Sequence, residues 1–302
     1  MPKRKTTDPH HSDLSDTAMP DASQDSDSDA SSTPSLINVD FEYFDPQPQD
    51  FHGLRTLLRQ LFSSDSPLFD LSSLSDLILS QPTIGTTIKT DGNESDPYAF
   101  MTVLNLNVHK NHPAVRGVVE YLFSKAGGED TVLGRRIREL VSRESSGAKG
   151  AGDVGLILTE RLINLPAQLA PPMYKMLAEE LEWAVLDGEP YHFAEFLVLS
   201  KTYTEVESKL DLEEKRPLKR GKKKGKKAGE VFYYHPEDEV VRRAVGEERC
   251  KLFEFTKEGE AADSKRAFSD MGVKMGGVVM MVEREQMGEV VKELERLFQP
   301  AS

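Results

Sequence analysis

Val154-Gly155-Leu156-Ile157-Leu158-Thr159 is a short, mostly apolar run that follows the glycine-rich segment 147–152. A run of this length and composition is typical of a strand that is buried on both faces of a sheet. Residues 193–203 form a second, longer apolar run and predict a long strand. Between the two runs, residues 174–186 have the apolar spacing of a helix that stops at Gly188.

The same alternation of strands and helices extends in both directions from this centre. Strict alternation over 37–43 predicts a half-buried strand, and residues 51–62 predict an amphipathic helix that Asp50 can cap. Further helices are expected near 70–80, 113–125, 130–143, 236–246 and 287–298, and further strands near 84–90, 98–108, 231–234, 251–255 and 278–282. This order predicts an α/β (mixed α+β) fold with a single central sheet flanked by helices.

The charge is divided unevenly along the chain. The 302 residues carry 51 acidic and 38 basic side chains, a net charge of -13. Residues 1–35 are rich in Ser and Asp, carry -4 and have almost no apolar side chains, so we expect an acidic, disordered tail. Residues 208–230 carry +6, which leaves -15 on the other 244 residues. We expect one globular domain over 36–302, with a basic, disordered loop inserted at about 208–230.

The basic run within this loop has three interpretations. Lys/Arg-rich segments of this length are typical nuclear-import signals, and Pro2-Lys3-Arg4-Lys5 is a weaker second one. A plain solvated insertion and a contact with RNA are the alternatives. The import candidates are Lys215, Arg216, Lys219, Arg220, Lys222, Lys223, Lys224, Lys226 and Lys227.

Composition excludes several classes of protein. A single cysteine excludes a disulfide scaffold and a Cys-rich zinc module. We expect no membrane-spanning segment, because no stretch approaches the roughly 20 apolar residues needed, and no secretory signal follows Met1. We also expect no direct DNA binding, since contacts to the phosphate backbone need a positive surface.

The motifs with possible chemistry each lack a required part. Residues 150–155 match G-x-G-x-x-G, but a strand follows where dinucleotide binding needs a helix. The segment that begins at Asp91 resembles a calcium loop without its glycine and its final glutamate. His109 and His112 have no third metal ligand nearby. We therefore predict no catalytic residues, no metal ligands and no cofactor, and expect a non-enzymatic protein.

Five segments together carry a family resemblance. They are 39–46, 50–61, 76–82, 91–98 and 155–166, and they resemble the BCCIP/Bcp family in order, from about residue 36 to the C-terminus. The resemblance implies a nuclear protein that shuttles to the cytoplasm and acts in nuclear export and in biogenesis of the large ribosomal subunit. One implied role is chaperone of a basic ribosomal protein of the L-twenty-three (universal L-fourteen) type. Another is export of a phosphatidylinositol phosphate kinase.

The family fold is similar to that of the GCN-five-related acetyltransferases, so an enzyme that uses acetyl-coenzyme A is an alternative. Such enzymes bind the cofactor with [Gln/Arg]-x-x-Gly-x-[Gly/Ala] at a helix start. Gly147 stands where one copy of this motif needs Gln or Arg. A second copy begins at Arg243 but has Glu248 at its last position, where a carboxylate would repel pyrophosphate. An RNA-binding assembly factor is a further alternative.

The partners expected from charge are different for the two parts. The basic loop suits a nuclear transport receptor, and the acidic body suits a basic client, since complementary potentials speed encounter. Candidate client-binding residues are Glu237, Asp238, Glu239, Glu247 and Glu248, although an ordinary solvated helix face would contain the same residues.

Overall fold

The two apolar runs lie side by side in an eight-stranded sheet. The protein is described by a computed structural model over residues 39–81, 83–145, 152–205, 230–256 and 273–299. The sheet has the order β1-β2-β3-β4-β5-β8-β7, and β6 also pairs with β5. Its strands are β1 (Glu42–Phe44), β2 (Thr86–Lys89), β3 (Ala99–Asn105), β4 (Asp153–Arg161), β5 (Phe193–Glu205), β6 (Val231–Tyr233), β7 (Cys250–Glu254) and β8 (Val273–Glu283). Neighbours pair antiparallel, except for the parallel pair β4–β5.

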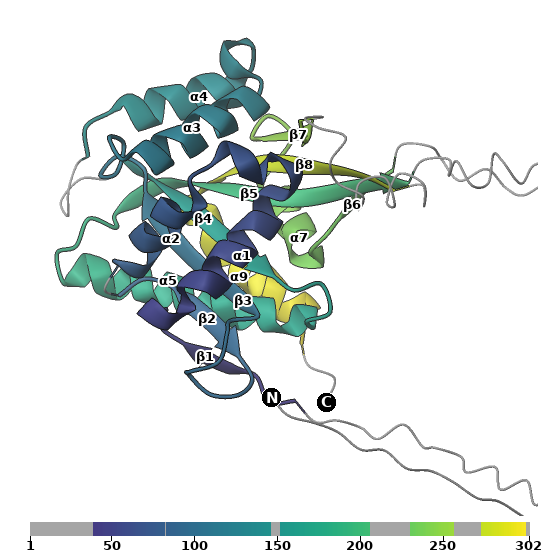
Figure 1. The fold of residues 1–302 in the computed structure, drawn as a ribbon. Coiled ribbons are helices and arrows are strands. Elements are labelled where there is room, and N and C mark those ends of the chain that lie inside the picture. The colour runs from purple at the N-terminus through teal and green to yellow at the C-terminus, as the bar shows by residue number, and fades with distance from the viewer. Residues whose placement is uncertain (1–38, 82, 146–151, 206–229, 257–272, 300–302) are drawn as a thin grey trace, which may run out of the picture. The chain divides into compact units, whose positions relative to one another are not determined.

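Helices cover both faces of the sheet (Figure 1). One face carries α1 (Phe51–Phe62), α2 (Leu71–Leu79), α3 (Pro113–Lys125) and α4 (Val132–Ser142). The other carries α5 (Ala170–Leu186), α7 (Pro236–Val245) and α9 (Arg284–Leu297). The prediction of one central sheet flanked by helices is therefore confirmed.

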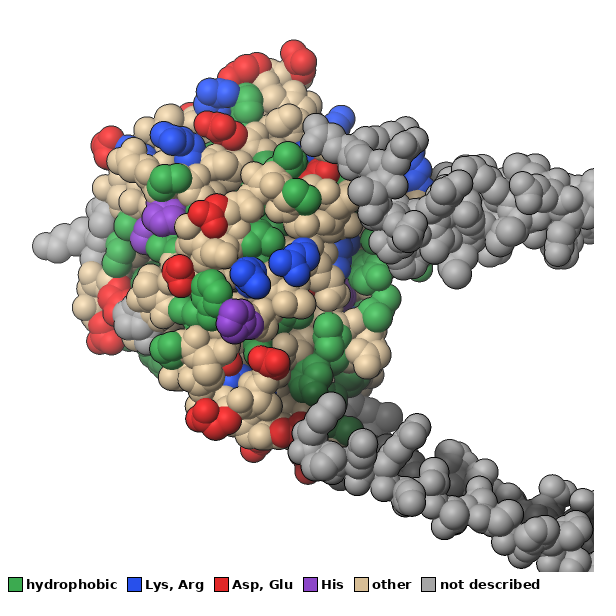
Figure 2. All heavy atoms as spheres, in the orientation of Figure 1, with side chains coloured by type: hydrophobic (Ala, Val, Ile, Leu, Met, Phe, Trp, Pro, Cys, Tyr) green, Lys and Arg blue, Asp and Glu red, His purple; other side chains and the backbone are tan. Residues whose placement is uncertain are grey.

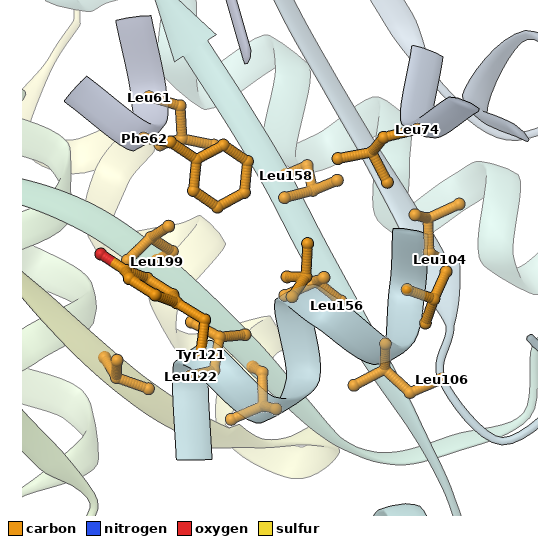
Figure 3. Packing of buried hydrophobic residues seen from close by; sticks show 14 of the residues in the cluster. Leu61, Phe62, Leu74, Leu104, Leu106, Tyr121, Leu122, Leu156, Leu158 and Leu199 are labelled. Carbon is orange, nitrogen blue, oxygen red and sulfur yellow. The ribbon is translucent and has the colours of Figure 1, made fainter. Parts of the chain in front are cut away.

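Two apolar cores result, because successive side chains of a strand point to opposite faces. Leu156 and Leu158 of β4 pack against the layer α1–α4, whereas Ile157 packs against the layer of α5, α7 and α9. Figure 3 shows the first core, with Leu156 and Leu158 among side chains from α1, α2 and α3. Burial on both faces explains why the central strands read as continuous apolar runs.

Most predicted elements form where the sequence pattern places them, and α1 and α3 have the predicted ends. The first strand is shorter than predicted, since pairing with β2 holds only Glu42–Phe44. Asp50 stands at the predicted N-cap position of α1, but its side chain makes no capping hydrogen bond to that helix. Its buried carboxylate accepts a hydrogen bond from the Gln47 backbone N–H at 2.9 Å and forms an ion pair with Lys89 at 2.7 Å.

The expectation of one globular domain can be compared with the described residues. The described residues from Asp40 onward belong to one compact unit. Residues 1–35 and 208–229 lie outside the described residues, so the disorder predicted for them stays a prediction, as does the likeness to the acetyltransferase fold. Of the helices in the described part, none is long and apolar enough to cross a membrane.

Candidate functional site

The parallel strands β4 and β5 are paired over only part of their length. Their pairing ends at Ile157–Val198, and the antiparallel pairing of β5 with β6 begins only at Thr202. The intervening residues of β5 therefore face a gap between β4 and β6. The chain that leaves β6 fills this gap, because the Tyr234 backbone N–H donates to the Lys201 carbonyl at 3.0 Å.

Glu160 is the centre of the charges on one face of this gap. Its carboxylate forms an ion pair with Lys201 Nζ at 2.6 Å and contacts His235 Nε2 at 2.7 Å. The Glu160 side chain is 0% exposed. Lys201 also lies over the Tyr234 ring, with Nζ 4.5 Å from the ring centroid. A buried lysine thus has a carboxylate and an aromatic face as partners.

Arg161 forms a second buried ion pair with the first turn of α7. Its Nε and Nη2 each donate to a carboxylate oxygen of Glu237 at 2.9 Å, the bidentate geometry that makes such pairs strong and directional. Its Nη1 donates to the Leu165 carbonyl at 2.6 Å. Glu237 also lies near the α7 N-terminus, where the helix dipole favours negative charge.

Asp238 is a third buried carboxylate, and it belongs to neither of these two ion pairs. The Ser200 hydroxyl donates to it at 2.5 Å, and no Lys or Arg among the described residues pairs with it. Burial, followed by the charge of Glu237, raises the pKa of Asp238 to about 7. Burial also raises the pKa of the nearby Tyr174 hydroxyl.

These six residues form what we call the α7 anchor: Glu160, Arg161, Lys201, His235, Glu237 and Asp238. The anchor joins the ends of β4 and β5 to the segment between β6 and α7. It thereby fixes β6 against β5, where Thr204 pairs with Val231. Residues 206–229 connect these two strands in the sequence, so the described residues on either side of them, Glu205 and Glu230, flank the paired positions Thr204 and Val231.

The anchor includes two of the predicted client-binding residues, and their assignment to an exposed surface is wrong. Glu237 and Asp238 are buried, since Arg161 and Ser200 from the neighbouring strands draw them into the gap. Glu239, Glu247 and Glu248 are exposed on or just after α7 and stay candidates for client binding.

The other sequence candidates divide between described and undescribed residues. All nine import candidates, from Lys215 to Lys227, lie outside the described residues. Arg243 and Gly246 form the last turn and the C-cap of α7, so this near-copy of the coenzyme A motif lies at a helix end that presents carbonyls, not N–H groups. In the part of the chain that the structure describes, no three His, Cys, Asp or Glu side chains group as metal ligands would.

Sequence reasoning missed four members of the anchor: Glu160, Arg161, Lys201 and His235. A signal was present, because Lys201 interrupts an apolar strand that is buried on both faces. A charged residue in such a position requires a counter-charge. What the sequence could not supply is its partner, since Glu160 lies 41 positions earlier in the chain.

Comparisons with known proteins agree on one family. The family model for BCCIP matches residues 36–241. Protein bcp1 of Aspergillus fumigatus is 49% identical over 266 residues, which cover 88% of this chain and 89% of that protein. Protein bcp1 of Schizosaccharomyces pombe is 43% identical over 264 residues, covering 87% of this chain and 91% of that protein.

A solved structure shares the fold. The crystal structure of BCP1 from Saccharomyces cerevisiae superposes with a TM-score of 0.58 at 26% sequence identity. The match covers 89% of this chain and 93% of the yeast chain. The similarity therefore extends over the described sheet and both helix layers.

Removal of the central carboxylate tests the anchor. We expect Glu160→Gln to lower the free energy of unfolding by about 3–5 kcal/mol, because Lys201 would stay buried without its counter-charge. Urea denaturation followed by circular dichroism measures this change. The control is Glu139→Gln, whose carboxylate pairs with Arg136 and Arg143 in water and should contribute little. Equal effects of the two variants would contradict a stabilising anchor.

The surplus carboxylate gives the anchor a pH dependence. Asp238 ionises near 3.8 in the unfolded chain and near 7 in the folded one, so folding binds a proton between these values. The titration of Asp238 therefore contributes a loss of stability as the pH rises from about 4 to about 7. Asp238→Asn lacks this titration. Urea unfolding at several pH values should show a stability difference between variant and wild type that grows up to pH 7; a pH-independent difference would refute the assignment.

Proposed function

The chain belongs to the BCCIP family, and on this premise we propose that it is a non-enzymatic nuclear binding protein that shuttles to the cytoplasm. We propose that it acts in nuclear export and in biogenesis of the large ribosomal subunit. Its central role in this proposal is to chaperone a basic ribosomal protein of the L-twenty-three (universal L-fourteen) type. The observation that carries the proposal is the net charge of -15 outside the N-terminal tail and the basic loop.

The burial of charge supports this proposal. Inside the anchor, Glu160 and Glu237 are matched by Lys201 and Arg161. Across the described residues, eight Asp and Glu but only three Lys and Arg are buried, so the interior holds about a third of the acidic excess of 15 charges. The excess therefore lies mainly at the surface, where it can attract a basic client and compete with RNA for that client. Figure 2 shows acidic side chains scattered among basic ones on the face that carries α1–α4. The client in this proposal is held by the summed field and by local contacts together.

Two further partners belong to the same proposal. A nuclear transport receptor is the partner of the basic run 215–227, and a phosphatidylinositol phosphate kinase is a second export cargo.

The acetyltransferase alternative requires binding of acetyl-coenzyme A, for which calorimetry is the direct test. A tagged pull-down at moderate salt with mass spectrometry tests the class of partner, since a chaperone of this kind should enrich one basic ribosomal protein.

Salt should weaken the binding of the client. Charges at the surface are screened beyond about 10 Å at 0.1 M salt. We therefore expect the affinity for a purified ribosomal protein of the L-twenty-three type to fall by about tenfold or more between 50 and 400 mM salt, a loss of about 1.4 kcal/mol. Isothermal titration calorimetry measures it. An affinity that stays constant over this range would show that the acidic surface is not what holds the client.

Loss of the basic run should move the protein to the cytoplasm. If the run is read by an import receptor, replacement of its nine Lys and Arg by Gln lowers the nuclear fraction of a fluorescent fusion several-fold. A second variant replaces Lys3, Arg4 and Lys5, the weaker import candidate, and should lower the nuclear fraction less than loss of the basic run does. An unchanged nuclear fraction, accompanied by lost crosslinking to RNA, would instead favour the RNA-binding alternative.

A further inference from the structure

The outer face of α5 carries two large apolar side chains in water. Trp183 is 61% exposed and Leu186 is 82% exposed, although the rest of the helix packs well against the second core. Three positions apart on a helix, they are surface neighbours. Tryptophan is enriched among the residues that contribute most to protein–protein binding. The two side chains therefore form one contiguous exposed apolar patch on a helix turn rather than scattered single residues.

The chain around this pair is acidic. From Met176 to Pro190 the sequence has five acidic residues and no Lys or Arg, and of the five acidic residues only Glu180 is buried. Glu179 and Glu182 lie four positions before Trp183 and Leu186 respectively, so each apolar side chain has a carboxylate beside it on the helix surface. Within the described part of the chain, neither carboxylate forms an ion pair.

The end of α5 leaves this negative charge uncompensated. A helix C-terminus carries a partial negative charge that favours basic residues in the last turn. The last turn of α5 has none, and Asp187 adds a carboxylate directly after it. The helix end is thus electrostatically unfavourable in isolation, and a cation placed there would relieve it.

We propose that Trp183 and Leu186, bordered by Glu179, Glu182 and Asp187, form a docking surface for a basic segment with apolar side chains on the partner. This surface deepens the proposed function, on which its link to the ribosomal client rests. Apolar side chains of the segment cover Trp183 and Leu186, and its Lys or Arg side chains pair with the three carboxylates and the end of α5. Acidic charge alone does not distinguish this surface, because Glu239, Glu247 and Glu248 form a second acidic group around α7. The α5 surface differs from that group because it also carries the exposed Trp183.

Trp183 is the only tryptophan of the chain, so its fluorescence reports directly on this surface. The probe is a synthetic peptide of Lys and Leu in amphipathic helical spacing, without aromatic residues. Its binding should shift the Trp183 emission to shorter wavelength, because the indole passes from water into apolar contact. A peptide of equal charge with Ser in place of Leu should give no shift. A shift of the same size with both peptides, or with neither, would overturn the proposal.

The client itself gives the second measurement. We expect the Trp183→Ala/Leu186→Ala variant to bind the ribosomal protein at least about tenfold more weakly than the wild type in calorimetry, since apolar hot spots lose this much or more. The control is Val132→Ala/Ile163→Ala, which removes two exposed apolar side chains from other surfaces. Because all four side chains are exposed, both variants should keep the thermal midpoint of the wild type.

The two measurements separate this proposal from the proposed function. If the wild type binds the client and the Trp183/Leu186 variant binds it equally well, the docking surface is wrong and the chaperone function stands. If the wild type does not bind the client while the Lys/Leu peptide still shifts the Trp183 emission, the client is wrong and the surface stands.

Discussion

The structure depends on how the gap between β4 and β5 is closed. Two parallel strands that diverge inside a sheet leave backbone groups and side chains without neighbours, and unpaired buried polar groups are costly. Here the chain after β6 enters the gap, with the Tyr234 N–H paired to Lys201 and the first turn of α7 paired to Arg161 and Ser200. The positions of β6 and α7, and with them the attachment of the basic segment, follow from this closure.

Closing the gap with ion pairs instead of apolar side chains has a structural consequence. Buried ion pairs contribute little net stability over apolar packing, but they are strongly directional. The bidentate contact of Arg161 with Glu237 and the bond of Ser200 to Asp238 admit one placement of the α7 N-terminus. The main effect of the anchor is therefore to fix the position of α7, and its effect on stability is secondary. Asp238 has no basic partner among the described residues, so the charges of the anchor are not optimised for stability at neutral pH.

The sequence predicted the elements well because their signals are local. The stripe over 51–62 and the runs at 154–159 and 193–203 are properties of neighbouring residues, and burial on both faces makes the central strands conspicuous. The errors came from contacts over long sequence separations. Asp50 lies at the N-cap position of α1, but its carboxylate pairs with Lys89 instead of capping the helix. The acidic start of α7 has the composition of a solvated face, but Glu237 is buried against Arg161. No periodicity within a helix reveals a partner that lies 76 positions away.

Net charge alone does not determine where this protein binds a partner, because electrostatic influence in salt extends only about 10 Å. Glu160 and Glu237 of the anchor are paired with Lys201 and Arg161 inside the fold, the basic run belongs to the sequence between β5 and β6, and the last turn of α5 contains no Lys or Arg. A partner meets one of these regions at a time. Which partner binds where is therefore set by the local combination of charge with apolar surface, and α5 presents carboxylates and an exposed tryptophan on the same turn.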